Sequence, residues 1–267
     1  DLAVGTLVSG YTDWQQYRVS GLDDERPLNP LPDPLPAPLT TFLGALGHTG
    51  LTAYIGLELI GGVRPGQTLV VSAAAGAVGS VVGQIAKARG ARVVGIAGGP
   101  EKCRYLVSEL GFDAAIDRHA PDWREQLASA TPDGIDVDFE NVGGEIMDEI
   151  LMRMNFRGRI AVCGMISQYD NAGRDWEGQR NIGQMLMQRL TVRGFIVTDE
   201  TELFEPGAAY LAGLLAEGRL RHDETIIDGF EHALDALHGM FSGANTGKLM
   251  VKVAESSGRS PETGVFA

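Results

Sequence analysis

Cysteine and positive charge are both scarce in this chain of 267 residues. The two cysteines, Cys103 and Cys163, have neither a C-x-x-C partner nor a nearby histidine, so we expect no metal site. A disulfide between them is not expected, and a reducing, cytoplasmic location fits. The 22 Lys and Arg stand against 35 Asp and Glu, a formal net charge of −13. That balance disfavours nucleic acid and anionic membrane surfaces as partners.

Long apolar runs are absent too, so neither a membrane span nor a signal peptide is expected. The 44 % hydrophobic and 21 % charged residues are ordinary for a soluble globular protein. The sequence begins at Asp1 rather than Met, which suggests a fragment or a missing start. In so acidic a chain, an anionic cofactor would need a local basic pocket, and Lys102, Arg104 and Arg118 are the candidates.

Residues 68–102 have the order of a dinucleotide-binding βαβ unit: strand, small-residue loop, helix, strand and basic turn. The β-branched run 68–73 suits a buried parallel strand. The loop holds Gly76, Ala77, Val78 and Gly79 at A-x-G-x-x-G spacing. Gly76 would let the backbone approach a pyrophosphate, and Gly79 would let the next helix lie close to the sheet. An alanine-rich helix packed on a strand is the simpler alternative, but the second strand favours the cofactor site.

The residues after the second strand indicate whether the site would bind NAD(H) or NADP(H). An NAD site has Asp or Glu about 20 residues beyond the glycines, to bind the ribose 2′-hydroxyl. Here Gly98 and its neighbours carry no carboxylate, so nothing would repel a 2′-phosphate. Lys102 follows in the first turn of a helix that Pro100 starts, and it could pair with that phosphate. NADP(H) is therefore favoured over NAD(H), although a solvated lysine would look the same.

Six strands alternate with helices, which predicts an α/β fold with a doubly wound parallel Rossmann sheet. The expected strands are 68–73, 92–97, 114–117, 135–140, 159–164 and 191–197, and the expected helices are 49–60, 77–89, 101–110, 122–130, 145–154, 181–189 and 203–216.

The two ends of the chain differ from this pattern. Near the start, 4–8 and 14–19 are short strand candidates, and the prolines of 27–38 make regular structure unlikely there. Residues 225–253 read as strand, helix and strand, and we expect them to pack with residues 1–45. The polar tail 255–267 is expected to be disordered.

Motifs along the chain resemble one family. In order they are LG at 46–47, GLTAY at 50–54, AAAGAVGSVVGQ at 73–84, NVGG at 141–144, CGMISQY at 163–169 and NTGK at 245–248. Together they resemble the zinc-independent branch of the medium-chain dehydrogenase/reductase superfamily, in particular the leukotriene B4 12-hydroxydehydrogenase, prostaglandin reductase and alkenal (curcumin) reductase group.

The resemblance implies two domains, a Rossmann domain at 46–219 and a GroES-like β-barrel. Residues 1–45 would be a remnant of the barrel and 220–254 a C-terminal return to it. The N-terminal part of the barrel, which supplies one wall of the substrate cleft in such enzymes, is absent from this sequence.

The resemblance also implies a set of cofactor contacts. The pyrophosphate would lie on 76–79 and the 2′-phosphate beside Gly98 and Lys102. Arg118 stands where relatives often carry Tyr, and as a planar fork of donors it could still bind phosphate. Asn141 would sit near the cofactor, although an N-cap or turn role fits it equally well. The nicotinamide half would meet Cys163, Gly164, Met165, Ile166, Ser167, Tyr169, Phe195, Ile196, Val197 and Asn245.

The implied chemistry is zinc-independent hydride transfer from NADPH to the β-carbon of an α,β-unsaturated ketone or aldehyde. Tyr169 is the candidate proton donor, and Cys163 is interpreted as a buried small hydrophobe rather than a redox group. Two alternatives stay open: an NADPH-dependent quinone oxidoreductase, and a nucleotide-binding protein without turnover. The resemblance further implies a homodimer through the edge strand 191–197.

Overall fold

The computed structural model describes residues 2–21, 28–60, 62–169, 178–254 and 265–266. At its centre is a six-stranded sheet in the order β5-β4-β3-β6-β7-β8, with every neighbouring pair parallel. Numbered within the sheet, this is the Rossmann order 3-2-1-4-5-6. The predicted fold class is confirmed. The strands are β3 (Thr68–Val71), β4 (Arg92–Ala97), β5 (Ala114–Asp117), β6 (Ile135–Glu140), β7 (Met154–Val162) and β8 (Thr191–Gly194).

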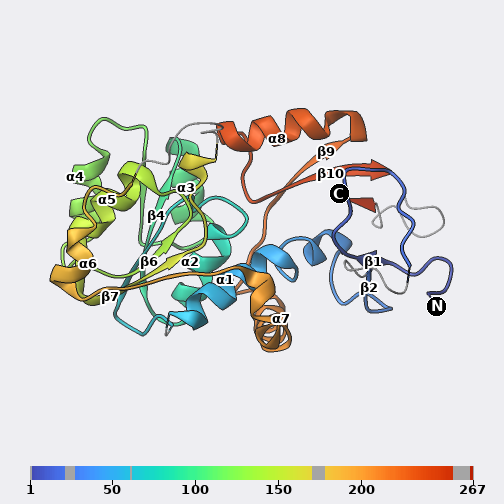
Figure 1. The fold of residues 1–267 in the computed structure, drawn as a ribbon, viewed down its shortest axis with the longest axis horizontal. Helices are drawn as coiled ribbons and strands as arrows, with labels where there is room; N and C mark the ends of the chain where they lie inside the picture. The colour runs from blue at the N-terminus through green and yellow to red at the C-terminus, as the bar shows by residue number, and fades with distance from the viewer. Residues whose placement is uncertain (1, 22–27, 61, 170–177, 255–264, 267) are drawn as a thin grey trace.

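Helices cover both faces of this sheet, because its central strands are apolar on both sides. One buried cluster joins the sheet to α1, α2, α3 and α7 through Leu57, Val82, Leu106 and Leu211. A second joins the other face to α4 and α5, which lie at the left of Figure 1. The helices are α1 (His48–Leu59), α2 (Gly79–Ala88), α3 (Pro100–Ser108), α4 (Trp123–Ala130), α5 (Gly144–Arg153), α6 (Gly183–Gln188), α7 (Phe204–Ala216) and α8 (Ala233–Ser242).

The two ends of the chain lie together beside the Rossmann sheet, at the right of Figure 1. The strands β1 (Val8–Ser9) and β2 (Asn29–Pro30) pair antiparallel. The expected strand, helix and strand of 225–253 are β9 (Glu224–Asp228), α8 and β10 (Lys248–Ala254). The parallel pair β9 and β10 belongs to a separate sheet in the order β11-β10-β9.

Several predicted boundaries are wrong at these ends. No strand forms at 14–19, and at 4–8 only Val8 joins a strand. Residues 255–264 of the tail lie outside the described part of the chain. The expected disorder is wrong for Val265–Phe266, which form β11 and pair antiparallel with β10. Short-range pattern misses these pairings because each partner is distant in sequence.

Three strands of the Rossmann sheet also differ from prediction at their ends. The strand β3 stops at Val71 rather than at residue 73, and β8 stops at Gly194, with Val197 beginning the 3-10 helix η3 (Val197–Asp199). The strand β7 starts earlier, at Met154, where it pairs with Ile135, and stops before Cys163. Cys163 and Gly164 instead donate their N–H groups to the Glu140 carbonyl, at 2.9 and 3.1 Å. The earlier ends of β3, β7 and β8 lengthen the loops at the carboxyl edge of the sheet.

Two acids are buried inside β6. Asp138 is fully buried between Val70 of β3 and Ile160 of β7, on the face that α4 and α5 cover. Neither of its carboxylate oxygens has a hydrogen-bond partner in the described residues. Burial, together with the nearby Glu140, raises the pKa of Asp138 well above its usual range. Burial without a hydrogen-bond partner therefore favours the neutral, protonated form of Asp138 in the folded protein.

This protonation makes stability depend on pH. Unfolded Asp138 releases its proton above a pKa of about 3.9, whereas folded Asp138 keeps it. The unfolded state then binds fewer protons, so the free energy of unfolding falls as pH rises above about 4. We expect Asp138→Asn to remove about 1.4 kcal/mol per pH unit of that slope, measured by urea unfolding between pH 4 and 7. The exposed Asp133→Asn is the control, and an unchanged slope in Asp138→Asn would contradict this prediction.

Candidate cofactor-binding site

In the turn between β3 and α2, the backbone of Gly79 lies very close to the backbone of Ala73 and Ala74. Ala73 has a positive φ of 49°, and its carbonyl accepts the Gly76 N–H at 3.0 Å. A Cβ on Gly79 would lie 2.6 Å from the Ala73 oxygen and 2.8 Å from the Ala74 Cα. Only glycine fits there, so α2 begins directly against the strand end. Without that contact the helix could not aim its first amides at the sheet edge.

The amides of this turn are available to a ligand. The N–H groups of Val78 and Gly79 donate to no other backbone group of the described chain. Both belong to the N-terminal turn of α2, where free amides and the helix dipole favour an anion. The helix starts two residues later than predicted, at Gly79 rather than residue 77. The four residues predicted to hold the pyrophosphate therefore form the turn and the start of the helix.

A basic pair lies at the ends of β4 and β5. A Cβ on Gly98 would be 3.4 Å from Arg118 Nε, so this glycine leaves room for the arginine. Lys102 Nζ donates to the Gly243 carbonyl at 2.8 Å. Burial, then the charge of Arg118, lowers the pKa of Lys102. Neither side chain makes an ion pair with a carboxylate among the residues described, so both can offer positive charge to a phosphate.

Beyond the turn, a hydrogen-bond network joins β3 to β6. Ser72 Oγ donates to Glu140 Oε1 at 2.6 Å and accepts the Asn141 N–H at 2.8 Å. Asn141 Nδ2 donates to the Ser72 carbonyl at 2.8 Å. Glu140 also accepts the N–H groups of Val142 and Gly143, at 2.5 and 2.9 Å. Asn141 thus binds across to β3 and does not cap α5, which starts at Gly144.

The Glu140 carboxylate holds the backbone at this edge of the sheet by accepting the N–H groups of Val142 and Gly143. It is fully buried, and burial raises its pKa although the three donors oppose that shift. Sequence reasoning missed Glu140 and Ser72. The only available signal was their position, because each stands at or next to the end of a central parallel strand, where ligands bind in such sheets.

The loop 163–169 packs on the loop that follows β6. Ile166 and Ser167 donate their N–H groups to the carbonyls of Asn141 and Val142, both at 3.1 Å. Burial raises the pKa of Cys163 to about 12, with a smaller contribution from Glu140, so its thiol stays protonated. That agrees with its interpretation as a small hydrophobe. Tyr169 is exposed, and its hydroxyl accepts the Met165 N–H at 3.3 Å.

The three side chains of the segment 195–197 differ in how far they are buried. Phe195 is partly buried and packs edge-to-face on Phe139, with ring centroids 6.2 Å apart, whereas Val197 is buried. Ile196 is 61 % exposed. Any contact of Val197 with a ligand would therefore have to come from its backbone.

Asn245 approaches the turn from the C-terminal return. Its Nδ2 donates to the Gly247 carbonyl at 2.9 Å, within its own loop. Gly247 N donates to the Ala75 carbonyl at 2.8 Å, which fastens this loop beside the small-residue turn. The structure thus brings the predicted residues to the carboxyl edge of the sheet and the loops that follow its strands.

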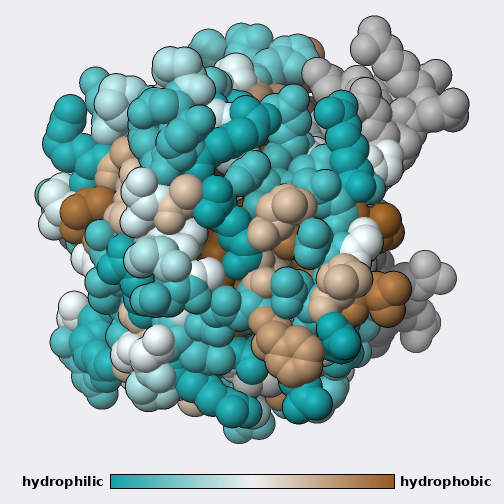
Figure 2. Space-filling model, turned by 90° about the vertical axis from the view of Figure 1, so that its left-hand side faces the viewer, coloured by the Kyte–Doolittle hydropathy of each residue, from teal (hydrophilic) through white to brown (hydrophobic). Residues whose placement is uncertain are grey.

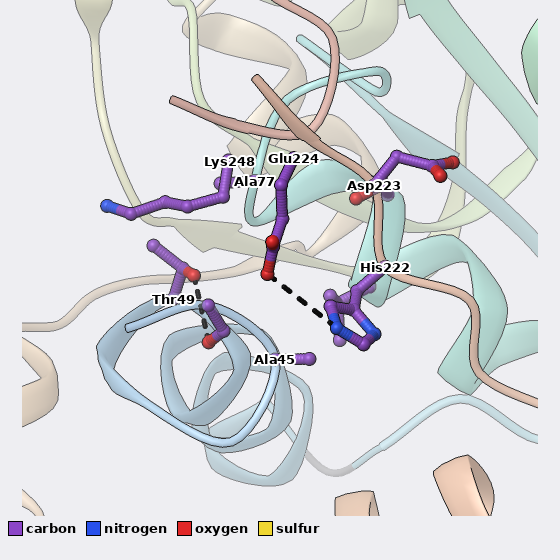
Figure 3. A pocket seen from close by; sticks show the side chains of 10 residues that line it. Ala45, Thr49, Ala77, His222, Asp223, Glu224 and Lys248 are labelled. Atoms are coloured by element: carbon purple, nitrogen blue, oxygen red, sulfur yellow. Dashed lines mark hydrogen bonds and ion pairs between the residues drawn. The ribbon is translucent and has the colours of Figure 1, made fainter. Parts of the chain in front are cut away.

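Next to that turn lies a narrow pocket whose polar residues the sequence did not single out. It is lined by Thr49, Ala77, His222, Glu224 and Lys248, among others (Figure 3). His222 Nε2 meets Thr41 Oγ1 at 3.1 Å and Glu224 Oε1 at 3.7 Å. These contacts join the 3-10 helix η1 (Leu39–Phe42) to the C-terminal return, two segments that are far apart in sequence.

Over the described residues, no three His, Cys, Asp or Glu side chains gather as a metal site would require. The same part of the chain contains no helix with the length and apolarity to cross a membrane.

The Rossmann order, the small-residue turn and the basic pair define a dinucleotide-binding oxidoreductase. Residues 77–212 match the family described as zinc-binding dehydrogenase. The chain is 41 % identical to the NADPH-dependent curcumin reductase of Escherichia coli, over 95 % of this chain and 74 % of that one. It is 43 % identical to rat (Rattus norvegicus) prostaglandin reductase 1, over 93 % of this chain and 75 % of that one.

A solved structure is also similar. CurA from Vibrio vulnificus in complex with NADPH superposes with a TM-score of 0.88 at 42 % identity, covering 96 % of this chain and 76 % of that one. The chain belongs to the zinc-binding dehydrogenase family, in its zinc-independent group of enone and alkenal reductases.

The basic pair predicts how one substitution will act. Lys102→Ala removes a charge-assisted contact to a 2′-phosphate, which only NADPH carries, so NADPH affinity should fall by about 1.5–3 kcal/mol. NADH affinity should change little. Fluorescence titration of both nucleotides measures this, with the exposed Arg124→Ala on α4 as control. Equal losses for NADPH and NADH would contradict the assignment.

Proposed function

We propose that this protein is an NADPH-dependent reductase of the C=C bond of α,β-unsaturated ketones and aldehydes. The observation that carries the proposal is the pair Lys102 and Arg118 beside the turn at 76–79, because it offers positive charge where a 2′-phosphate would lie. The names of its relatives, a curcumin reductase and a prostaglandin reductase, support the substrate class.

The cofactor would supply the hydride that adds to the β-carbon of the enone. The protein would bind this cofactor and orient it. Val78 and Gly79 offer amides to the pyrophosphate, and the backbone of 163–169, held by Asn141 and Val142, lines the nicotinamide side. Hydride addition leaves an enolate, which a proton must neutralise at the α-carbon.

Tyr169 is our candidate for delivering that proton. Its hydroxyl oxygen accepts the Met165 N–H, which leaves the hydroxyl proton free to be donated. The accepted hydrogen bond also stabilises the phenolate that donation would leave. In this proposal residues 1–45 and 220–254 are the parts of the substrate domain present here, and 46–219 bind the cofactor.

The experiment is turnover of NADPH, followed by its absorbance, with a simple enone and with a simple quinone. Consumption with the enone and not the quinone supports the proposal, and the reverse selects a quinone oxidoreductase. Tyr169→Phe should lower kcat about 10- to 100-fold, the typical contribution of general acid catalysis being 10²–10⁴, while NADPH affinity is retained. An unchanged kcat would remove Tyr169 from the mechanism, and binding without turnover of either substrate would contradict the reductase.

We also propose a homodimer and a cytoplasmic location. The strand β8 ends the six-stranded sheet, so its outer edge has no neighbour among the described strands. Exposed apolar side chains lie around it: Met152, Phe156, Ile182, Leu186, Met187 and Ile196. Figure 2 views the side that carries α6 and shows brown hydrophobic residues between hydrophilic ones. The two free cysteines suit a reducing compartment.

Oligomeric state tests the dimer. We expect a dimer in sedimentation velocity, weakened by Leu186→Asp, because that carboxylate would be buried in an apolar interface. Val107→Asp, also at an exposed apolar position but on α3, should leave the dimer intact. A monomeric wild-type chain, or equal effects of the two substitutions, would refute this interface.

A further inference from the structure

Lys248 lies beside the small-residue turn, at the start of β10. Gly247, its neighbour, bridges to Gly76 and donates to the Ala75 carbonyl, so the chain enters β10 directly against the turn. Lys248, Ala77 and Thr49 line the same pocket (Figure 3). The lysine therefore stands between the N-terminal turn of α2 and the first turn of α1.

The ammonium of Lys248 has no partner in the described part of the chain, where it makes neither a hydrogen bond nor an ion pair. The side chain is half-buried, and burial lowers its pKa. Glu224 is its register partner on β9, yet the Glu224 carboxylate turns to His222. Figure 3 shows the lysine extending away from both. A partly desolvated cation without a counter-charge is unfavourable unless a ligand supplies one.

The ligand of this ammonium must lie outside the pocket. The cavity itself measures about 10 Å³, room for a single water. The lysine side chain leaves the backbone beside Ala77 and extends past Thr49, away from His222 and Glu224 (Figure 3). The ammonium thus lies beyond the residues that close the pocket on the other side.

The other cations of the site are placed elsewhere. Lys102 stands in the first turn of α3 and Arg118 directly follows β5, where the 2′-phosphate is expected. The pyrophosphate is left with the amides of Val78 and Gly79, which are neutral donors. A dinucleotide on the turn would bring two further negative charges next to Ala77, beside the one cation of this pocket without a partner in the described structure.

We propose that Lys248 binds the pyrophosphate of NADP(H) through its ammonium. This assignment rests on the proposed cofactor. It makes the C-terminal return part of the cofactor site, so the segment that carries Asn245 is held down when the dinucleotide is bound. A charge-assisted contact of this kind adds affinity without distinguishing NADPH from NADH, since both carry the pyrophosphate.

Lys248→Met tests the proposal through binding rather than turnover. Titrations use NADPH, NADH and adenosine 2′-monophosphate, which has no pyrophosphate. The variant should bind both dinucleotides about 10- to 100-fold more weakly, with their ratio unchanged, and adenosine 2′-monophosphate as wild type does. Lys248→Arg should restore most of the loss. Lys87→Met, at a lysine of α2 that is paired with Asp113, is the matched control and should change nothing.

Three outcomes would overturn the proposal. Unchanged dinucleotide affinity with a raised KM for the enone would assign the ammonium to the substrate. Equal weakening of adenosine 2′-monophosphate would show a general disturbance of the site. A change in the NADPH-to-NADH ratio would place Lys248 at the 2′-phosphate. Absence of NADPH binding by the wild-type chain would instead refute the proposed function itself, so the two failures are distinguishable.

Discussion

The contact between the first turn of α2 and the end of β3 is the constraint on which the site depends. It exists because Gly79 has no Cβ, which would otherwise meet the backbone of Ala73 and Ala74 at 2.6 to 2.8 Å. The same approach leaves the amides of Val78 and Gly79 pointing beyond the sheet edge and lets Gly247 bridge to Gly76. The position of the C-terminal return follows from this turn.

Much of the Rossmann sheet could be predicted from local pattern. The strands β4, β5 and β6 have the predicted bounds: β4 and β5 are short, largely apolar runs, and β6 alternates apolar with acidic residues, the period-2 pattern of a strand. Local sequence pattern gave wrong strand bounds where a strand depends on pairing with a residue distant in sequence. Met154 joins β7 only because it meets Ile135, and the apparent strand at 14–19 finds no partner in the described structure. Spacing alone contains no information about either contact.

The candidate site likewise has one part that the local sequence predicts and another that only the fold brings together. The turn at 76–79 and Lys102 are local to the βαβ unit, so these candidate residues could be named from sequence. Glu140 and Ser72 act through contacts about 68 residues apart in the chain, and Lys248 reaches the turn from the other end of the protein. The motif NTGK at 245–248 includes Lys248, but only the fold shows that this segment meets the turn, through the bridge between Gly76 and Gly247.

A crystal structure of this chain with NADPH would test the central claim most directly. The account predicts the 2′-phosphate within hydrogen-bonding distance of Lys102 or Arg118, and the pyrophosphate on the amides of Val78 and Gly79. A cofactor bound at another edge of the sheet, or a 2′-phosphate held by neither cation, would contradict it.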